Sequence, residues 1–74
     1  EREIAFVKIK ESSIEKSMMD KISKNEFLKI HKTNNNEIII ECVDSPKNIN
    51  IFLESLENIA EKIVRSGAVG INSN

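Results

Sequence analysis

The pattern of apolar and polar residues is clearest in the middle of the chain. Residues 37–43 contain three isoleucines, a valine and a cysteine, and β-branched side chains favour a strand. Because side chains alternate across a strand, one face is wholly apolar, with Ile38, Ile40 and Cys42. The other face is mixed, with Glu37, Ile39, Glu41 and Val43. The pattern predicts a central strand with one face in the core.

Three more segments have the alternation of strands. In residues 1–10, one face carries Ala5, Val7 and Ile9, and the other carries Ile4, Phe6, Lys8 and Lys10. In residues 27–32, Leu28 and Ile30 alternate with Phe27, Lys29 and His31, and the polar turn at 33–36 makes a hairpin with the central strand. The last strand is expected within residues 62–71, with Ser66-Gly67 as either a bulge or its beginning.

Two helices are expected between these strands. The first spans residues 12–24, since Ser12 and Glu15 have the spacing of a capping box and apolar residues recur at Ile14, Met18 and Ile22. It should end near Asn25, a residue that tolerates a left-handed turn. The second begins with Ser45 as its cap and Pro46 at its first position, and ends near residues 58–60. Its apolar stripe is Ile49, Phe52, Leu53 and Leu56.

The order β-α-β-β-α-β with a central hairpin predicts an α+β, ferredoxin-like sandwich. It has one four-stranded antiparallel sheet, both helices on one face, and the first and third strands in the centre. The predicted core consists of Val7, Ile9, Leu28, Ile30, Ile38, Ile40, Ile49, Phe52, Leu53 and Leu56.

Composition narrows the class of protein. The 74 residues form one small domain, 39% hydrophobic and 31% charged. Eleven basic and twelve acidic residues give a net charge of −1, which argues against nucleic-acid binding. One cysteine excludes an internal disulfide and fits a cytoplasmic location. No apolar run is long enough for a membrane span.

Candidate chemistry is sparse. His31 and Cys42 lie on neighbouring strands, but their parity places them on opposite faces, and two ligands do not complete a zinc site. We therefore expect Cys42 in the core and His31 at the surface. Gly67 and Gly70 lack the spacing of a dinucleotide fingerprint. No serine, histidine and acid are arranged as a nucleophile with its base. The sequence predicts no catalytic residue, no cofactor and no metal.

The two ends of the chain resemble one known family. Residues 1–9, Glu-Arg-Glu-Ile-Ala-Phe-Val-Lys-Ile, and residues 63–71, Ile-Val-Arg-Ser-Gly-Ala-Val-Gly-Ile, are similar to the opening and close of one domain. This is the C-terminal domain of the acetolactate synthase small, regulatory subunit. Residues 38–49 and Phe52-Leu53-Glu54 also resemble it. The family's Pro-Phe-Gly after the second helix is replaced by Asn58-Ile59-Ala60, and the first helix has little similarity.

The resemblance implies a ferredoxin-like fold and a non-catalytic role. The family's small subunit binds the thiamine-diphosphate-dependent catalytic subunit, raises its activity and confers valine inhibition in branched-chain amino acid synthesis. We expect residues 1–74 to be a piece of a longer subunit, without the N-terminal ACT domain that binds valine in the family. The alternatives are a standalone sensor of a small ligand or metal that acts as an oligomer and, third, an acylphosphatase-like enzyme. That enzyme would need a catalytic arginine in a loop, whereas Arg65 lies in the C-terminal stretch.

The face of the sheet away from the helices is the predicted interface. It should expose a contiguous apolar patch, made of Ile4, Phe6, Phe27, Ile39 and Val43. Ala68 and Gly70 would add flat surface if Val69 and Ile71 turn inward. Lys8, Glu41 and His31 would form the polar rim. We expect two copies of the chain to associate through this face as a symmetric dimer. Cover from the missing domain or the catalytic subunit is the alternative.

Overall fold

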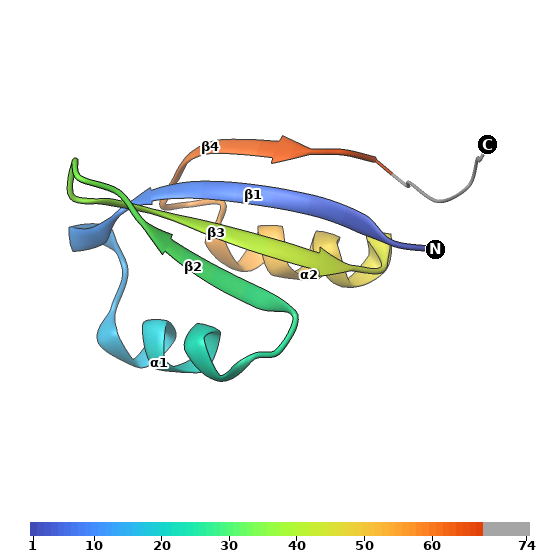
Figure 1. Cartoon of the computed structure of the whole chain (residues 1–74), viewed down its shortest axis with the longest axis horizontal. Helices are drawn as coiled ribbons and strands as arrows, with labels where there is room; N and C mark the ends of the chain where they lie inside the picture. The colour runs from blue at the N-terminus through green and yellow to red at the C-terminus, as the bar shows by residue number, and fades with distance from the viewer. Residues whose placement is uncertain (68–74) are drawn as a thin grey trace.

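The computed structural model describes residues 1–67, which form four strands and two α-helices in the predicted order (Figure 1). The strands are β1 (Glu3–Lys10), β2 (Leu28–Lys32), β3 (Glu37–Asp44) and β4 (Ala60–Arg65). The helices are α1 (Lys16–Lys24) and α2 (Pro46–Leu56), and a short 3₁₀ turn, η1 (Glu11–Ser13), follows β1. Neither helix is long and apolar enough, within this described part of the chain, to cross a membrane.

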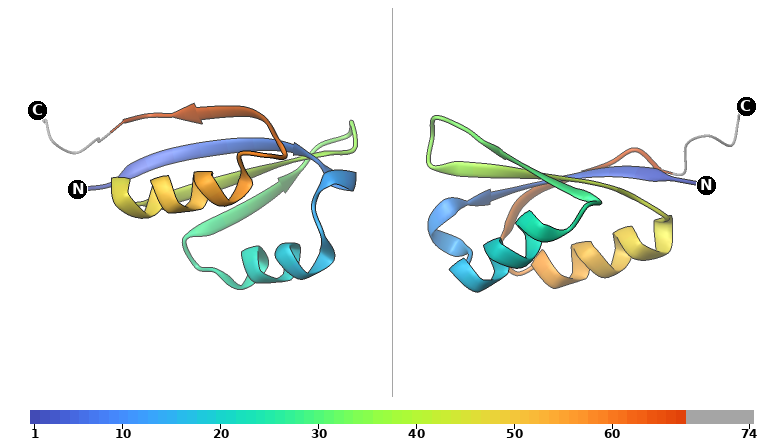
Figure 2. Two further views of the ribbon diagram at one scale, coloured as in Figure 1. Left: turned by 180° about the vertical axis from the view of Figure 1, so that it is seen from behind. Right: turned by 60° about the horizontal axis from the view of Figure 1, so that its bottom comes forward.

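The four strands form one antiparallel sheet in the order β2-β3-β1-β4. The two central strands pair along their whole length, from Glu3 opposite Asp44 to Lys10 opposite Glu37. Both helices lie on the same side of the sheet (Figure 2). The predicted ferredoxin-like sandwich is confirmed, including which strands are central and which are edges.

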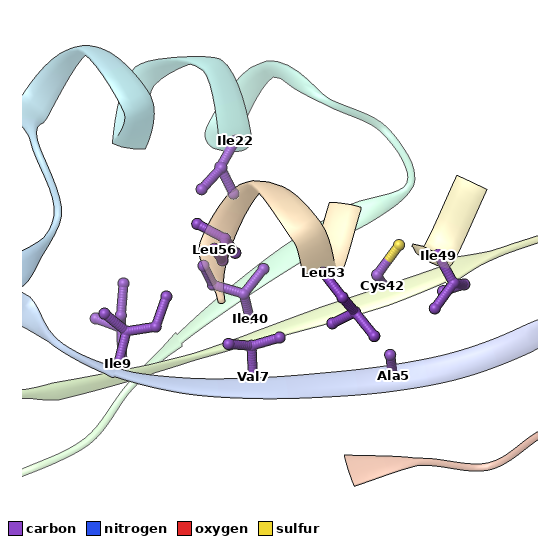
Figure 3. Close-up of a cluster of buried hydrophobic side chains, with 10 residues drawn as sticks. Ala5, Val7, Ile9, Ile22, Ile40, Cys42, Ile49, Leu53 and Leu56 are labelled. Atoms are coloured by element: carbon purple, nitrogen blue, oxygen red, sulfur yellow. The ribbon is translucent and has the colours of Figure 1, made fainter. Parts of the chain in front are cut away.

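The core lies between the helices and the inward side of β1 and β3 (Figure 3). Its buried side chains are Ala5, Val7, Ile9, Ile22, Ile38, Ile40, Cys42, Ile49, Leu53 and Leu56. Three predicted core residues, Leu28, Ile30 and Phe52, pack against this cluster but stay partly exposed. Leu28 and Ile30 belong to an edge strand, and Phe52 borders the gap between the two helices, so each is covered on one side only.

The first helix begins later than predicted. The chain leaves β1 through η1, Ile14 is extended, and α1 starts only after Glu15, its N-cap, which makes no side-chain cap hydrogen bond. Ser12 therefore lies outside the helix and the predicted capping box does not form. Ile14 still packs on the core beside Met18 and Ile22, so the apolar spacing correctly predicted the contacts. The helix does end at Asn25, but this residue is extended (φ −87°) rather than left-handed.

The second helix and the hairpin follow the predicted local chemistry. The Ser45 hydroxyl accepts a hydrogen bond from the backbone N–H of Asn48 at 3.3 Å, and Pro46 occupies the first turn. In the asparagine turn, Asn36 takes the left-handed conformation (φ 61°) that closes short hairpin loops. The turn is fixed further by the Thr33 hydroxyl, which donates to the carbonyl of Glu37.

The last strand begins earlier than predicted. Helix α2 ends at Leu56, and β4 already starts at Ala60. Its bulge lies at Glu61, because Lys8 pairs with Lys62 whereas Ile9 pairs with Ala60. Ser66-Gly67 is therefore neither the bulge nor the beginning of this strand, although Gly67 does have a positive φ of 75°. The predictions for Ala68, Val69, Gly70 and Ile71 fall outside the described residues.

Candidate protein-interaction surface

We call the side of the sheet away from the helices the open face. Alternation places Ile4 and Phe6 of β1 and Ile39 and Val43 of β3 on it, as predicted from the sequence. Phe27 joins them at the edge, because its carbonyl accepts a hydrogen bond from the Val43 N–H. Phe6 is 39% exposed and Phe27 is 43% exposed, which is unusual for phenylalanine. The five residues thus lie on one face, and their role as an interface stays a prediction.

Val64 belongs to the same apolar patch and was missed in the sequence. It lies directly opposite Phe6 in the pairing of β1 with β4, and it is 48% exposed. The available signal was the pair Ile63-Val64, whose β-branched side chains suit a strand. With Val64, apolar side chains extend across the open face from the beginning of β2 to β4.

Basic side chains surround this apolar patch. Lys8 of β1 lies directly opposite Lys62 of β4, and together with Phe6, Ile39 and Val64 they line a hollow of about 220 Å³. Towards the other edge, a second hollow beside Phe27 and Val43 is lined by Arg2 and Lys29 together with the carboxylates Glu26 and Glu41. The open face therefore combines exposed apolar surface with positive charge at the β1–β4 hollow and mixed charge at the other edge.

The histidine and the cysteine lie as predicted. His31 is on the open face, where its ring Nε2 lies 3.1 Å from Oε1 of Glu41. Cys42 points into the core, and burial raises the pKa of its thiol to about 11, with the nearby charge of Asp44 adding to the effect. At neutral pH the thiol is thus protonated. Within residues 1–67, no three histidine, cysteine, aspartate or glutamate side chains are grouped as a metal site would require.

A buried ion pair joins the first strand to the last. Glu3 is only 2% exposed, and its carboxylate accepts two hydrogen bonds from Arg65, one from Nε and one from Nη2, each of 2.7 Å. The Gly67 N–H donates to the same carboxylate at 3.2 Å. These hydrogen bonds, above all those from Arg65, hold the pKa of Glu3 below its ordinary value although burial alone would raise it. The guanidinium of Arg65 also donates to Asn50 of α2 at 2.6 Å, so it is engaged in structure.

The ion pair between Glu3 and Arg65 was not predicted from the sequence. The position of Glu3 could have indicated it, because Glu3 continues the inward-facing series of Ala5, Val7 and Ile9. A carboxylate buried there needs a cationic partner. The ion pair joins the two stretches, at the beginning and near the end of the chain, that carry the family resemblance.

Comparison with protein families decides which family this is. The model described as the small subunit of acetolactate synthase matches residues 2–74. The chain belongs to this family. The comparison with curated proteins and the comparison with solved structures gave no match. The small subunit is a regulatory component, and its family implies association with a catalytic subunit.

Proposed function

We propose that this chain is a non-catalytic domain of a regulatory subunit. It binds the thiamine-diphosphate-dependent catalytic subunit of acetolactate synthase and raises its activity in branched-chain amino acid biosynthesis. The family match over residues 2–74 carries the proposal. It is supported by an exposed apolar face of the kind that protein partners cover.

The side chains that were considered from the sequence as metal ligands or as a catalytic arginine make other interactions in the structure. Cys42 is a buried, protonated core residue, Arg65 holds the carboxylate of Glu3, and His31 pairs with Glu41 at the surface. These assignments support a binding role over the acylphosphatase-like and metal-sensor alternatives.

Reconstitution tests the proposal. The purified chain is added in increasing amounts to purified catalytic subunit, and acetolactate formation from pyruvate is followed. We expect the specific activity to rise and then saturate as the complex forms, with no acetolactate from the chain alone. An unchanged rate, together with the absence of a complex in size-exclusion chromatography at micromolar concentrations, would refute the proposal.

A titration with valine provides a second test of the proposed function. The family resemblance places the valine site in an ACT domain, whereas residues 1–67 form a ferredoxin-like unit built around the core of Figure 3. We therefore expect no saturable heat when millimolar valine is titrated into this chain in a calorimeter. A one-site isotherm would show that the chain itself holds an effector site.

A further inference from the structure

We propose that the open face binds a partner surface that presents carboxylates beside apolar side chains, with one carboxylate placed between Lys8 and Lys62. The inference deepens the proposed function and rests on it for the identity of the partner, the catalytic subunit. The features that carry it are a pair of lysines that face each other, the hollow between them and the absence, among residues 1–67, of a carboxylate from the lining of that hollow.

The lysine pair is unfavourable for folding. Lys8 and Lys62 are direct cross-strand neighbours, and like charges in this position destabilise a sheet. The other strand lysines on this face lie opposite carboxylates instead, Lys10 opposite Glu37 and Lys29 opposite Glu41. Among residues 1–67, no carboxylate forms a salt bridge with Lys8 or Lys62. A charge pattern that the fold does not need points to a partner that supplies the missing negative charge.

The hollow between the lysines has the right chemistry for an acidic side chain. Its other walls are the apolar side chains of Phe6, Ile39 and Val64. A glutamate or aspartate from a partner would place its carboxylate by the two ammonium groups and its carbon stem against these walls. A partner that covers the hollow would also exclude water from it, which strengthens the attraction between the charges.

The charge at the hollow favours an acidic partner there over a second copy of the chain. Over the whole open face, basic side chains and carboxylates nearly balance, but within the described part of the chain the hollow is lined by two lysines and no carboxylate. The basic side chains are Arg2, Lys8, Lys10, Lys29 and Lys62, and the carboxylates on or beside the face are Glu26, Glu37, Glu41 and Glu61. A symmetric dimer in which two such hollows face each other would bring two lysine pairs together, whereas an acidic partner compensates the charge of one pair.

A small carboxylate probes the hollow independently of any protein partner. Hexanoate has one carboxylate and an apolar tail, and hexylamine is its control with the opposite charge. In amide NMR spectra we expect hexanoate, at millimolar concentration, to give saturable shifts around residues 6, 8, 39, 62 and 64, and hexylamine to give none. Absent shifts, or equal shifts with hexylamine, would overturn the proposed carboxylate site.

The catalytic subunit tests the same site in the complex. The double variant Lys8→Gln, Lys62→Gln should bind it about tenfold more weakly than the wild type, with a weaker dependence on salt. Lys47→Gln, an exposed lysine of α2, is the matched control and should bind like the wild type. Equal affinity of the double variant would overturn the inference and leave the proposed function intact. No binding of the wild-type chain would instead refute the proposed function, and the hexanoate result would then decide the inference alone.

Two other occupants of the open face are distinguished by separate measurements. A wild-type chain that is dimeric in sedimentation equilibrium, and monomeric after Phe6→Glu, would identify a second copy as the occupant and overturn the acidic partner. Lysines and exposed phenylalanines also suit single-stranded nucleic acid. If a labelled oligonucleotide binds the wild type at micromolar concentration and does not bind the double lysine variant, single-stranded nucleic acid is the occupant and the acidic protein partner is overturned.

Discussion

Glu3 is a charged residue in a position that the strand pattern reserves for the core. Its carboxylate is tolerated there because Arg65 neutralises it with two hydrogen bonds and Gly67 adds a third. Arg65 itself reaches solvent, with 37% of its side chain exposed, so only one of the two charges is fully removed from water. The arrangement avoids much of the desolvation cost that makes fully buried ion pairs weak.

Replacing this carboxylate should weaken the fold in a pH-dependent manner. Glu3→Gln should lower the free energy of unfolding by about 2 kcal/mol at pH 7, the order of hydrogen bonds to a charged group. The folded-state pKa of Glu3 lies below its unfolded value of about 4.3, so the ion pair stabilises above that value and is lost as pH falls through the folded pKa. Urea unfolding at pH 7 and pH 3 should thus show a smaller gap between wild type and variant at pH 3. An equal gap at both pH values, or an equal loss in the exposed control Glu54→Gln, would contradict this account.

For the contacts of single residues, the sequence predicted less than the structure shows. Alternation alone places Glu3 on the inward side of β1, so the need for a partner was predictable. Arg65 was not predictable as that partner, because its position opposite Ala5 depends on the bulge at Glu61. Bulges arise from how two strands fit together over the whole sheet, which local patterns do not encode.

Of the two serines predicted to cap helices, only Ser45 does so in the structure. Ser45 caps α2, so Ser45→Ala should destabilise the domain by about 1 kcal/mol. Ser12 lies in η1, outside α1, so Ser12→Ala should change the stability by a few tenths of a kcal/mol at most. Chemical denaturation of both variants checks the difference. Equal losses would mean that the capping box at Ser12 and Glu15 forms after all.

Helix α2 provides a second comparison, between a buried and a half-buried residue of one apolar stripe. Leu56 is 1% exposed and packs in the core, so Leu56→Ala should cost about 3 kcal/mol. Phe52 has core on one side and the gap between the helices on the other, so Phe52→Ala should cost about 2 kcal/mol. This is less than the 3–5 kcal/mol typical of a fully buried phenylalanine. A cost for Phe52→Ala above that for Leu56→Ala, measured by urea denaturation, would show that Phe52 is more deeply buried.

Element types were predictable from periodicity, whereas element ends were not. The spacing of Ile14, Met18 and Ile22 correctly predicted which side chains meet the core, but the chain needs a 3₁₀ turn and an extended residue before α1 can begin. Likewise β4 begins at Ala60, because a short turn after Leu56 suffices to return the chain to the sheet. Both boundaries lie in the connections between helix and sheet, and local periodicity does not encode where such connections end.

The molecule as a whole has two unlike faces. Both helices cover one side of the sheet (Figure 2). They close over the apolar core, while the open face leaves phenylalanine, isoleucine and valine side chains beside lysines. Such a division costs little in an isolated chain but favours association, since each large apolar side chain covered by a partner contributes about 1.5–3 kcal/mol. The open face was predictable because strand parity and helix placement follow from the sequence; its outer extent at Val64 depended on where β4 begins.

A pair of matched substitutions tests whether the catalytic subunit binds the open face rather than the helical side. Phe6→Glu puts a carboxylate in the middle of the apolar patch, and Ile51→Glu makes a comparable change on the exposed side of α2, where Ile51 is 58% exposed. Neither residue belongs to the buried core, so both variants should remain folded, with Phe6→Glu the less stable because its new carboxylate lies directly opposite Glu41. Only Phe6→Glu should then lose binding to the catalytic subunit in size-exclusion chromatography, because it would bury a new charge against apolar side chains and face the partner's carboxylates. If Phe6→Glu binds as the wild type does, or if Ile51→Glu loses binding, the partner contacts the helical side and the open face is not the interface.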